Sequence, residues 1–207
     1  MSTTAVRTFK NKDDNSKMIN QYKVIKTLGS GSFASVKLCV DTKTEIQYAI
    51  KQMNKKELRS KAIGNGRNAY DCVLDELNVM QRLEHPNIIW LHEIIDDPKK
   101  DSIFLVTEYH SKGSLGDTLS NLNAGRGEND PKIGLKRESV RLYLIDILRA
   151  LHYCHKVIKV IHRDIKPANI MYEPETHTTS LTDFGIARVT DSSKTKTGMV
   201  LGTPSYM

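Results

Sequence analysis

The sequence predicts an α+β fold in which an antiparallel sheet of five strands and one long helix precede a mainly helical part. Between residues 21 and 109, five short runs alternate apolar and polar residues, as half-buried strands do. Beyond residue 110, apolar residues recur at three- and four-residue spacing, which is typical of amphipathic helices. We therefore divide the chain into two lobes, 21–109 and 110–207, preceded by a flexible tail over residues 1–20, which are polar and charged.

The first lobe contains the strands and the long helix. The strands are expected at residues 22–28, 35–40, 45–52, 88–95 and 102–109. The helix is expected over residues 69–83, where Val73, Leu77 and Met80 would share one face. The lysine-rich residues 54–68, which include Gly64 and Gly66, predict a surface loop between the third strand and this helix.

The second lobe contains two expected helices and one expected strand. A short helix begins near Lys112, and residues 121–134 hold three glycines in an exposed loop. A long amphipathic helix follows over residues 138–155, with its apolar stripe in the core. A strand is expected at residues 180–182.

Composition excludes several classes of protein. The 207 residues are 39% hydrophobic and carry a net charge of +7, and they contain no apolar run long enough to span a membrane. The polar start lacks the apolar segment of a secretory signal, so we expect a cytoplasmic protein, with the nucleus as an alternative. Three widely separated cysteines predict neither a disulfide framework nor a zinc site. Because lysines and arginines are spread along the chain, we do not expect nucleic acid as a partner.

The most informative stretch runs from His162 to Asn169 and is followed by Asp183-Phe184-Gly185. It places Asp164, Asn169 and Asp183 at fixed spacing. Phosphoryl transfer needs one carboxylate that orients a hydroxyl nucleophile and two hard oxygen ligands that hold Mg²⁺ on ATP. Either half of the motif alone would be weak, because Asp-Phe-Gly also suits an ordinary turn.

From about residue 22 to its last residue, the chain resembles eukaryotic protein serine/threonine kinases. The resemblance implies a two-lobe kinase fold, ATP and Mg²⁺ as cofactors, and protein substrates. It implies that Asp164 is the catalytic carboxylate, that Lys166 neutralises the transferred phosphoryl group, and that Asn169 and Asp183 bind the metal. His162 is expected to pack under Phe184 as a structural residue. The family continues with Ala-Pro-Glu after Met207, so the helical lobe is expected to be incomplete.

A glycine-rich turn matches the kinase loop that covers the phosphates of ATP. Glycine lets backbone N–H groups approach phosphate oxygens closely, although the stretch alone could be a plain hairpin. Ala34 replaces the third glycine of the family pattern. The resemblance assigns this turn to ATP binding through Leu28, Gly29, Ser30, Gly31, Ser32, Phe33, Ala34, Ser35 and Val36.

Tyr48-Ala49-Ile50-Lys51 matches the strand lysine of kinases. An inward-pointing lysine is costly unless anions meet it, and the implied anions are the phosphates of ATP and Glu76. Asp75 and Glu84 are the competing carboxylates. The resemblance also implies a hinge at Thr107, Glu108 and His110, and a purine site between Val36, Ala49 and Met171; as apolar residues these last three could equally be core.

Arg163 precedes the catalytic aspartate, and in kinases such an arginine pairs with a phosphate on the activation segment. The resemblance therefore implies an upstream kinase that acts on Thr197 or Thr195, with Ser192 and Ser193 as further acceptors. The alternative is that this polar stretch is only a loop.

Three segments resemble the calcium/calmodulin-dependent protein kinase kinase group: residues 69–76, 93–98 and 202–207. A basic insert at residues 55–67 lies where that group carries an insert, but it lacks the arginine- and proline-rich character of that insert. Calmodulin is then an implied partner whose site would lie beyond Met207. The predicted function is ATP-dependent phosphorylation of serine or threonine in proteins, and the alternative is an inactive nucleotide-binding scaffold.

Overall fold

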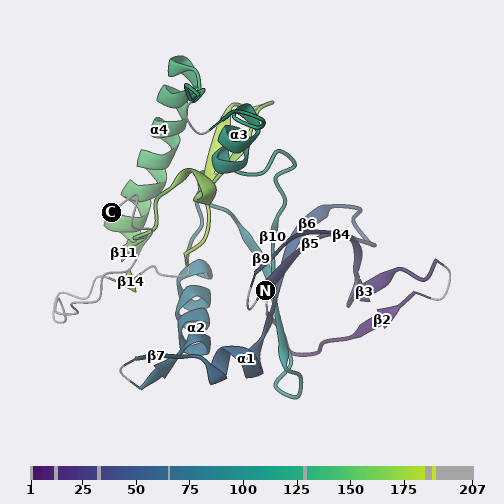
Figure 1. The fold of residues 1–207 in the computed structure, drawn as a ribbon. Helices are drawn as coiled ribbons and strands as arrows, with labels where there is room; N and C mark the ends of the chain where they lie inside the picture. The colour runs from purple at the N-terminus through teal and green to yellow at the C-terminus, as the bar shows by residue number, and fades with distance from the viewer. Residues whose placement is uncertain are drawn as a thin grey trace. The chain divides into compact units, whose positions relative to one another are not determined.

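The computed structural model describes residues 2–11, 14–31, 34–64, 66–127, 130–184 and 188–189. Its chain divides into two compact units (Figure 1). Unit 1 comprises residues 1–74 and 90–109, and unit 2 comprises residues 75–89 and those from 110 onward. The sequence-based division placed all of 21–109 in one lobe, whereas residues 75–89 pack with unit 2 because their backbone and side chains bond to it, as at Asn87 and Arg82.

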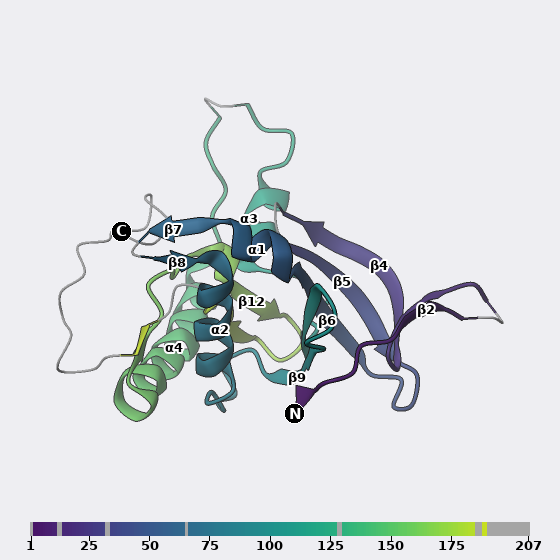
Figure 2. The ribbon, with the colours of Figure 1, turned by 90° about the horizontal axis from the view of Figure 1, so that it is seen from below.

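Unit 1 is built on an eight-stranded sheet in the order β1-β9-β10-β6-β5-β4-β3-β2. The five predicted strands form its centre and pair antiparallel. They are β4 (Tyr22–Ser30), β5 (Ala34–Asp41), β6 (Gln47–Asn54), β9 (Leu91–Asp96) and β10 (Ser102–Glu108). The sheet curls so that β4, β5 and β6 arch over its interior (Figure 2).

The sequence predicted a flexible tail over residues 1–20, and the described part of this segment contains short strands. It forms β1 (Ser2–Thr3), β2 (Thr8–Lys10) and β3 (Lys17–Ile19). β1 pairs parallel with β9, and β3 pairs antiparallel with β4. The segment therefore adds β1 to one edge of the five-stranded sheet, and β3 and β2 to the other.

The apolar core of unit 1 lies inside the curled sheet. It is made of buried side chains from both edges and from the central strands. They are Ile19, Tyr22, Cys39, Tyr48, Ile50, Ile95, Phe104 and Val106, with Val6 and Val24 packed against them. Tyr22 donates to Glu93 over 2.6 Å, and Thr3 also donates to Glu93, so one buried carboxylate ties β4 and β1 to β9.

The surface loop expected at residues 54–68 is instead folded. It contains α1 (Lys55–Ser60) and a hairpin of β7 (Ala62–Gly64) and β8 (Arg67–Asn68), which extends beyond α1 (Figure 2). Asn54 caps α1 by accepting from two backbone N–H groups. Lys55 can be buried because its ammonium group forms an ion pair with Asp96 at 2.8 Å, which compensates the loss of hydration.

The helix α2 (Ala69–Met80) begins in unit 1 and ends in unit 2. It occupies the first twelve residues of the helix predicted over 69–83. Val73, Leu77 and Met80 are buried on it, as the periodicity predicted.

Unit 2 packs two helices beside a small hairpin. The helices are α3 (Leu115–Leu122) and α4 (Arg137–Tyr153), and a π-helical turn at Cys154–Ile158 extends α4. The hairpin pairs β12 (Ile170–Glu173) with β13 (Thr178–Leu181). A short pair of β11 (Val160–Ile161) and β14 (Arg188–Val189) lies in the same unit. No helix among the described residues is long and apolar enough to cross a membrane.

Candidate functional site

The loop between β11 and β12 in unit 2 positions Asp164. Lys166 donates to Asp164 Oδ2 over 2.7 Å, and Asn169 Nδ2 donates to the same oxygen over 2.9 Å. Asn169 Nδ2 also donates to the backbone carbonyl of Asp164 over 2.8 Å. These bonds fix the rotation of the carboxylate, so the structure brings together three of the predicted site residues.

Asn169 lies in a 3₁₀ turn, η2 (Pro167–Asn169), and is 5% exposed. Its backbone N–H donates to Lys166, and its carbonyl accepts from Thr182. Because both of these side-chain hydrogen bonds use Nδ2, the amide is oriented with Oδ1 as its hard oxygen ligand. An oxygen of this kind suits Mg²⁺, which protein sites bind through few side-chain oxygens together with substrate phosphates.

Asp183 follows β13 closely, and β13 is anchored within unit 2 by hydrogen bonds between Leu181 and residues 87–89. The backbone of Asp183 is left-handed, with a φ of 61°, and that of Arg163 has a φ of 69°. Such conformations cost free energy in residues other than glycine and are concentrated at functional sites. Arg163 directly precedes Asp164, and Asp183 is the second residue after the end of β13.

His162 packs against Phe184, as predicted, with ring centroids 4.6 Å apart. Its Nδ1 accepts from the backbone N–H of Asp164, so Nε2 carries the proton and donates to the Thr182 carbonyl over 2.9 Å. Burial lowers the pKa of His162, although the Thr182 carbonyl and the nearby Asp183 and Asp164 carboxylates act in the opposite direction. The histidine is therefore a neutral structural link between the Asp164 loop and the strand end before Asp183.

In unit 1, Lys51 lies on β6 opposite Val36 of β5 and Leu105 of β10. Ala49, two residues earlier, lies opposite Thr107, whose hydroxyl donates to the Ala49 carbonyl over 3.3 Å. Since side chains alternate along a strand, Val36, Ala49, Lys51 and Thr107 share one face of the sheet. The opposite face carries the apolar core.

The glycine-rich turn is the hairpin between β4 and β5, in which Gly29 lies opposite Val36 and Ser30 opposite Ser35. Gly31 N–H donates to the Ala34 carbonyl over 2.8 Å and closes the turn. A Cβ added to Gly29 would meet nothing within 4 Å. Packing within the described protein therefore does not demand glycine at this position, whereas the close approach of a phosphate would.

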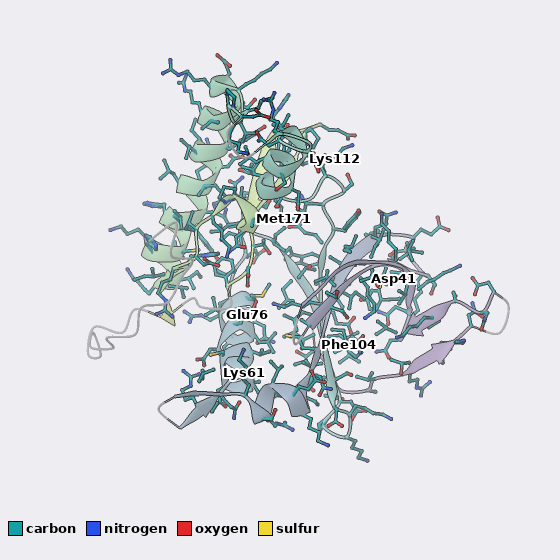
Figure 3. All side chains as sticks on the ribbon, in the orientation of Figure 1. Asp41, Lys61, Glu76, Phe104, Lys112 and Met171 are labelled. Atoms are coloured by element: carbon teal, nitrogen blue, oxygen red, sulfur yellow. The ribbon has the colours of Figure 1, made fainter. Side chains whose placement is uncertain are left out.

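Among the three candidate carboxylates around α2, Glu76 is 6% exposed, while Asp75 and Glu84 are exposed. A buried carboxylate requires a compensating cation or donors. Burial therefore favours Glu76, which Figure 3 labels on α2. The spacing alone did not decide among the three.

The remaining predicted positions are distributed between the units. The backbone N–H and the carboxylate of Glu108 both bond the Trp90 backbone in unit 1. Leu28 is exposed on β4. In unit 2, the His110 carbonyl accepts from Gly113, and Met171 lies on β12 (Figure 3). Ser32, Phe33, Gly185, Ser192, Ser193, Thr195 and Thr197 lie outside the described residues.

Sequence reasoning missed one contact that supports the Asp164 loop. A Cβ added to Gly116 of α3 would lie 2.9 Å from the Ala168 Cα, so only glycine allows α3 to approach η2 this closely. Ser114 and Asp117 form a capping box at the start of α3, with Gly116 between them. The Ser-x-x-Asp spacing in the sequence could have predicted that a helix starts at this position.

Comparison with known proteins identifies the family. Residues 22–207 match the protein kinase domain family. The chain belongs to this family. It is 37% identical over 179 residues to a probable serine/threonine-protein kinase of Dictyostelium discoideum, covering 86% of this chain and 24% of that protein.

Two further relatives carry similar names. The serine/threonine-protein kinase ssp1 of Schizosaccharomyces pombe is 33% identical, over 92% of this chain and 28% of that protein. The serine/threonine-protein kinase GRIK1 of Arabidopsis thaliana is 33% identical, over 94% of this chain and 46% of that protein. The chain spans less than half the length of these relatives. The predicted serine/threonine kinase family and its α+β fold are thus confirmed.

Proposed function

We propose that this protein kinase transfers a phosphoryl group from ATP to serine or threonine hydroxyls of protein substrates. The observation that carries the proposal is the Asp164 carboxylate, held at Oδ2 by Lys166 at 2.7 Å and by Asn169 at 2.9 Å. An anionic oxygen fixed in this way can orient an incoming hydroxyl group and accept its proton.

The groups that the reaction needs fit the chemistry of the residues present. Asn169 and Asp183 would hold Mg²⁺ through hard oxygens, and Lys51 with the Gly29–Gly31 turn would hold the phosphates. When bound, Mg-ATP supplies the phosphoryl group, and its terminal P–O bond breaks as a bond to the substrate oxygen forms. Within the described residues, no three His, Cys, Asp or Glu side chains gather as a metal site, which suits a cation shared between few protein oxygens and the nucleotide.

Unit 1 supplies residues suited to binding a nucleotide, and unit 2 supplies residues suited to the transfer of its phosphoryl group. On unit 1, Val36, Ala49 and Thr107 offer an apolar face beside Lys51, suited to a purine and its phosphates. On unit 2, Lys166 lies beside Asp164, where its cation would offset charge on the phosphoryl group during transfer. An inactive scaffold would not need the bonds that fix Asp164, so we favour the enzyme.

We also propose membership in the calcium/calmodulin-dependent protein kinase kinase-like group, supported by the sequence of residues 69–76, 93–98 and 202–207. Its substrates would be other kinases, and an upstream kinase would act on Thr197 or Thr195. Incubation with catalytically dead kinases as substrates tests the first point, and mass spectrometry of the phosphorylated chain tests the second. Phosphorylation only of proteins that are not kinases would contradict the proposed substrate class. Phosphate at neither Thr197 nor Thr195 would contradict the proposed action of an upstream kinase.

The decisive test of the enzyme is Asp164→Asn. The amide keeps the size of the side chain but cannot accept the hydroxyl proton, so kcat should fall by about 10²–10⁴-fold. ATP affinity, measured by isothermal titration calorimetry, should change little because the substitution leaves the proposed metal ligands intact. Glu175→Gln, at an exposed position of the turn after β12, is the matched control. ATP binding without phosphate transfer by the unsubstituted protein would favour the scaffold instead.

A further inference from the structure

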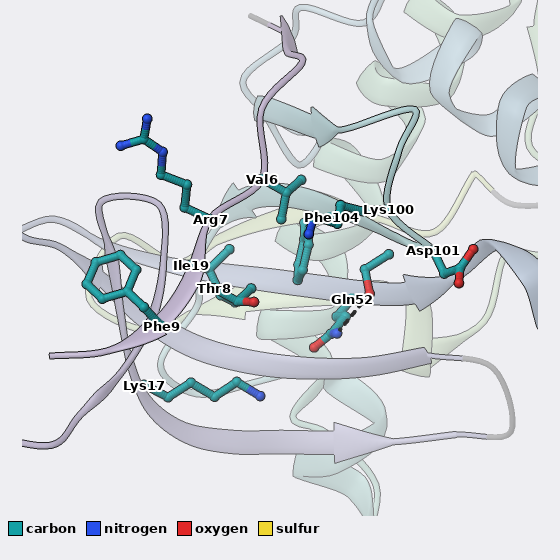
Figure 4. Close-up of a pocket in the computed structure, with 11 residues that line it drawn as sticks. Val6, Arg7, Thr8, Phe9, Lys17, Ile19, Gln52, Lys100, Asp101 and Phe104 are labelled. Atoms are coloured by element: carbon teal, nitrogen blue, oxygen red, sulfur yellow. Dashed lines mark hydrogen bonds between the residues drawn. The ribbon is translucent and has the colours of Figure 1, made fainter.

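Unit 1 contains a cavity of about 500 Å³ that the proposed reaction does not use. The cavity lies between the N-terminal segment and the inner side of the curled sheet (Figure 4). Its lining comes from four parts of the chain: residues 6–9, β3, β6, and β10 with the turn before it. The volume is within the range of about 300–1,000 Å³ that is usual for ligand pockets.

The cavity faces away from the proposed nucleotide site. Gln52 lines it, and Lys51 is the preceding residue of β6, so the two side chains point to opposite faces of the sheet. Gln52 lies opposite Ser35 on one side and opposite Phe104 on the other. A ligand in the cavity would therefore lie across the sheet from Val36, Ala49 and Lys51.

The cavity walls combine apolar and hydrogen-bonding groups. Ile19 and Phe104 are both 0% exposed to solvent, and Val6 points inward beside them (Figure 4). Thr8 and Gln52 place a hydroxyl and an amide among them, and Gln52 Nε2 donates to Ser102 Oγ over 3.4 Å. Burying these polar groups against a hydrocarbon chain would cost free energy, because the chain offers them no partner.

Positive charge surrounds the polar part of the cavity. Lys17 and Lys100 line it, and Lys37 donates to Gln52 Oε1 over 2.6 Å. Burial lowers the pKa of Lys37, and repulsion from the Lys17 cation lowers it further, which indicates a positive potential at this point. Asp101 is the one carboxylate that the described lining contains. Asp14, on the loop between β2 and β3, is already paired with Lys23.

The wall formed by the N-terminal segment is held in place. Asn20 accepts from the Arg7 N–H over 2.7 Å, donates its own N–H to the Arg7 carbonyl over 2.8 Å, and donates Nδ2 to the Ala5 carbonyl over 3.0 Å. A preformed wall reduces the ordering cost of binding. The cavity is thus a site that exists before its ligand arrives.

We infer that this cavity is a docking site for an acidic peptide segment of a partner protein, anchored by one bulky apolar side chain. The apolar side chain would occupy the space beside Val6, Ile19 and Phe104. The peptide backbone would bond Thr8 and Gln52, and its carboxylates would meet Lys17, Lys37 and Lys100. A peptide can hydrogen-bond the polar groups of the cavity and also fill its apolar part. A fatty acid can fill the apolar part and pair its carboxylate with a lysine, but its hydrocarbon chain cannot hydrogen-bond Thr8 or Gln52.

The test is fluorescence anisotropy with a labelled heptapeptide of six glutamates and one phenylalanine, measured without nucleotide. We expect saturable binding that Lys17→Glu and Lys100→Glu each weaken by about tenfold, since each reverses a cation facing an acidic ligand. Thr8→Trp, on the cavity wall, should also weaken binding by filling the space. Lys43→Glu, in the exposed turn after β5, is the matched control and should leave binding unchanged. All four positions are exposed, so the variants should fold.

Two further probes separate the alternatives. A peptide with alanine in place of phenylalanine lacks the apolar anchor, and one with lysine in place of glutamate lacks the negative charge. Each should bind at least about tenfold more weakly than the acidic peptide. Laurate should not compete. The proposal is overturned if the acidic peptide fails to bind, if laurate displaces it, or if Lys17→Glu and Lys43→Glu have equal effects. Because nucleotide is absent, none of these outcomes depends on phosphoryl transfer.

Discussion

At Asp164, two donors from the same loop meet on a single carboxylate oxygen. Lys166 and Asn169 are two and five residues further along the chain, so the whole arrangement is local. Charge-assisted hydrogen bonds of this kind are the stronger class in proteins and leave little freedom to the side chain. A short motif can therefore carry the geometry of a reactive group, provided that the loop itself is held in place.

His162 supplies part of that support, and its titration gives a prediction at the residue scale. Its pKa in the folded protein is lowered chiefly by burial, so the folded state resists protonation more than the unfolded chain does. The stabilising contribution is complete above the unfolded pKa of about 6.5 and is lost as pH falls below it. We expect the free energy of unfolding to decrease between pH 7.5 and pH 5.5, by at most about 1.4 kcal/mol per pH unit from this group.

Urea unfolding at several pH values measures this effect. His162→Gln should have a shallower pH dependence than the unsubstituted protein, even though the substitution lowers stability at every pH. His155→Gln, at an exposed position of the turn after α4, should keep the full slope. His85, whose pKa is also lowered by burial, accounts for part of the slope that persists. An unchanged slope in His162→Gln would show that this histidine is not protonated differently on unfolding.

At the scale of elements, α3 supports the Asp164 loop through a close backbone approach. The Cβ of an alanine at position 116 would lie 2.9 Å from the Ala168 Cα and 3.0 Å from its nitrogen. Both of these atoms belong to backbone, which cannot rotate out of the way. The helix and η2 would have to separate, and Asn169, the next residue, would move with them.

The substitution Gly116→Ala tests this close approach, because helix propensity alone would make the alanine variant more stable. In a helix, alanine is normally more favourable than glycine by about 0.5–1 kcal/mol. A net loss of stability would therefore be due to the clash of the added Cβ with the Ala168 backbone. We expect a loss of about 1–3 kcal/mol, the usual cost of overpacking, with a lower kcat. Gly134→Ala, where an added Cβ meets nothing within 4 Å, is the control. A stabilised Gly116→Ala protein, measured by thermal unfolding, would contradict the clash.

The elements also show what could be predicted from the sequence. The strand β6 and the helices α2 and α4 were predictable because one face of each is buried, which leaves a periodic pattern. β1 and β2 were not, because such short, mostly exposed strands depend on distant partners, such as Ile95 for Thr3. The buried Lys55 was likewise unpredictable, because its partner Asp96 is 41 residues away. The Asp164 loop was predictable because its contacts are local.

At the scale of the whole molecule, the N-terminal segment changes what unit 1 can do. Its strands lie at both edges of the sheet, β1 beside β9 and β3 beside β4, and only four residues, 4–7, join β1 to β2. The five Cα–Cα steps from Thr3 to Thr8 span at most roughly 18 Å, so these ends of β1 and β2 lie within that distance of each other. The segment thus links the two edges of the sheet and at the same time forms one wall of the proposed docking cavity.

Substitutions at Lys51 and Asp183 test the nucleotide contacts on which the proposed function rests. If Lys51 of unit 1 and Asp183 of unit 2 serve one bound Mg-ATP, each substitution should weaken nucleotide binding. Lys51→Met removes a charge-assisted contact worth about 1.5–3 kcal/mol, or roughly 10- to 150-fold in Kd. Asp183→Asn should instead abolish the dependence of ATP affinity on Mg²⁺. Because both residues would act on the same triphosphate, the double variant should lose less than the sum of the two single losses. Isothermal titration calorimetry with ATP, with and without Mg²⁺, measures all three effects, and Lys43→Met and Glu175→Gln are the controls. Unchanged affinity in either single variant would mean that the substituted residue does not contact the nucleotide.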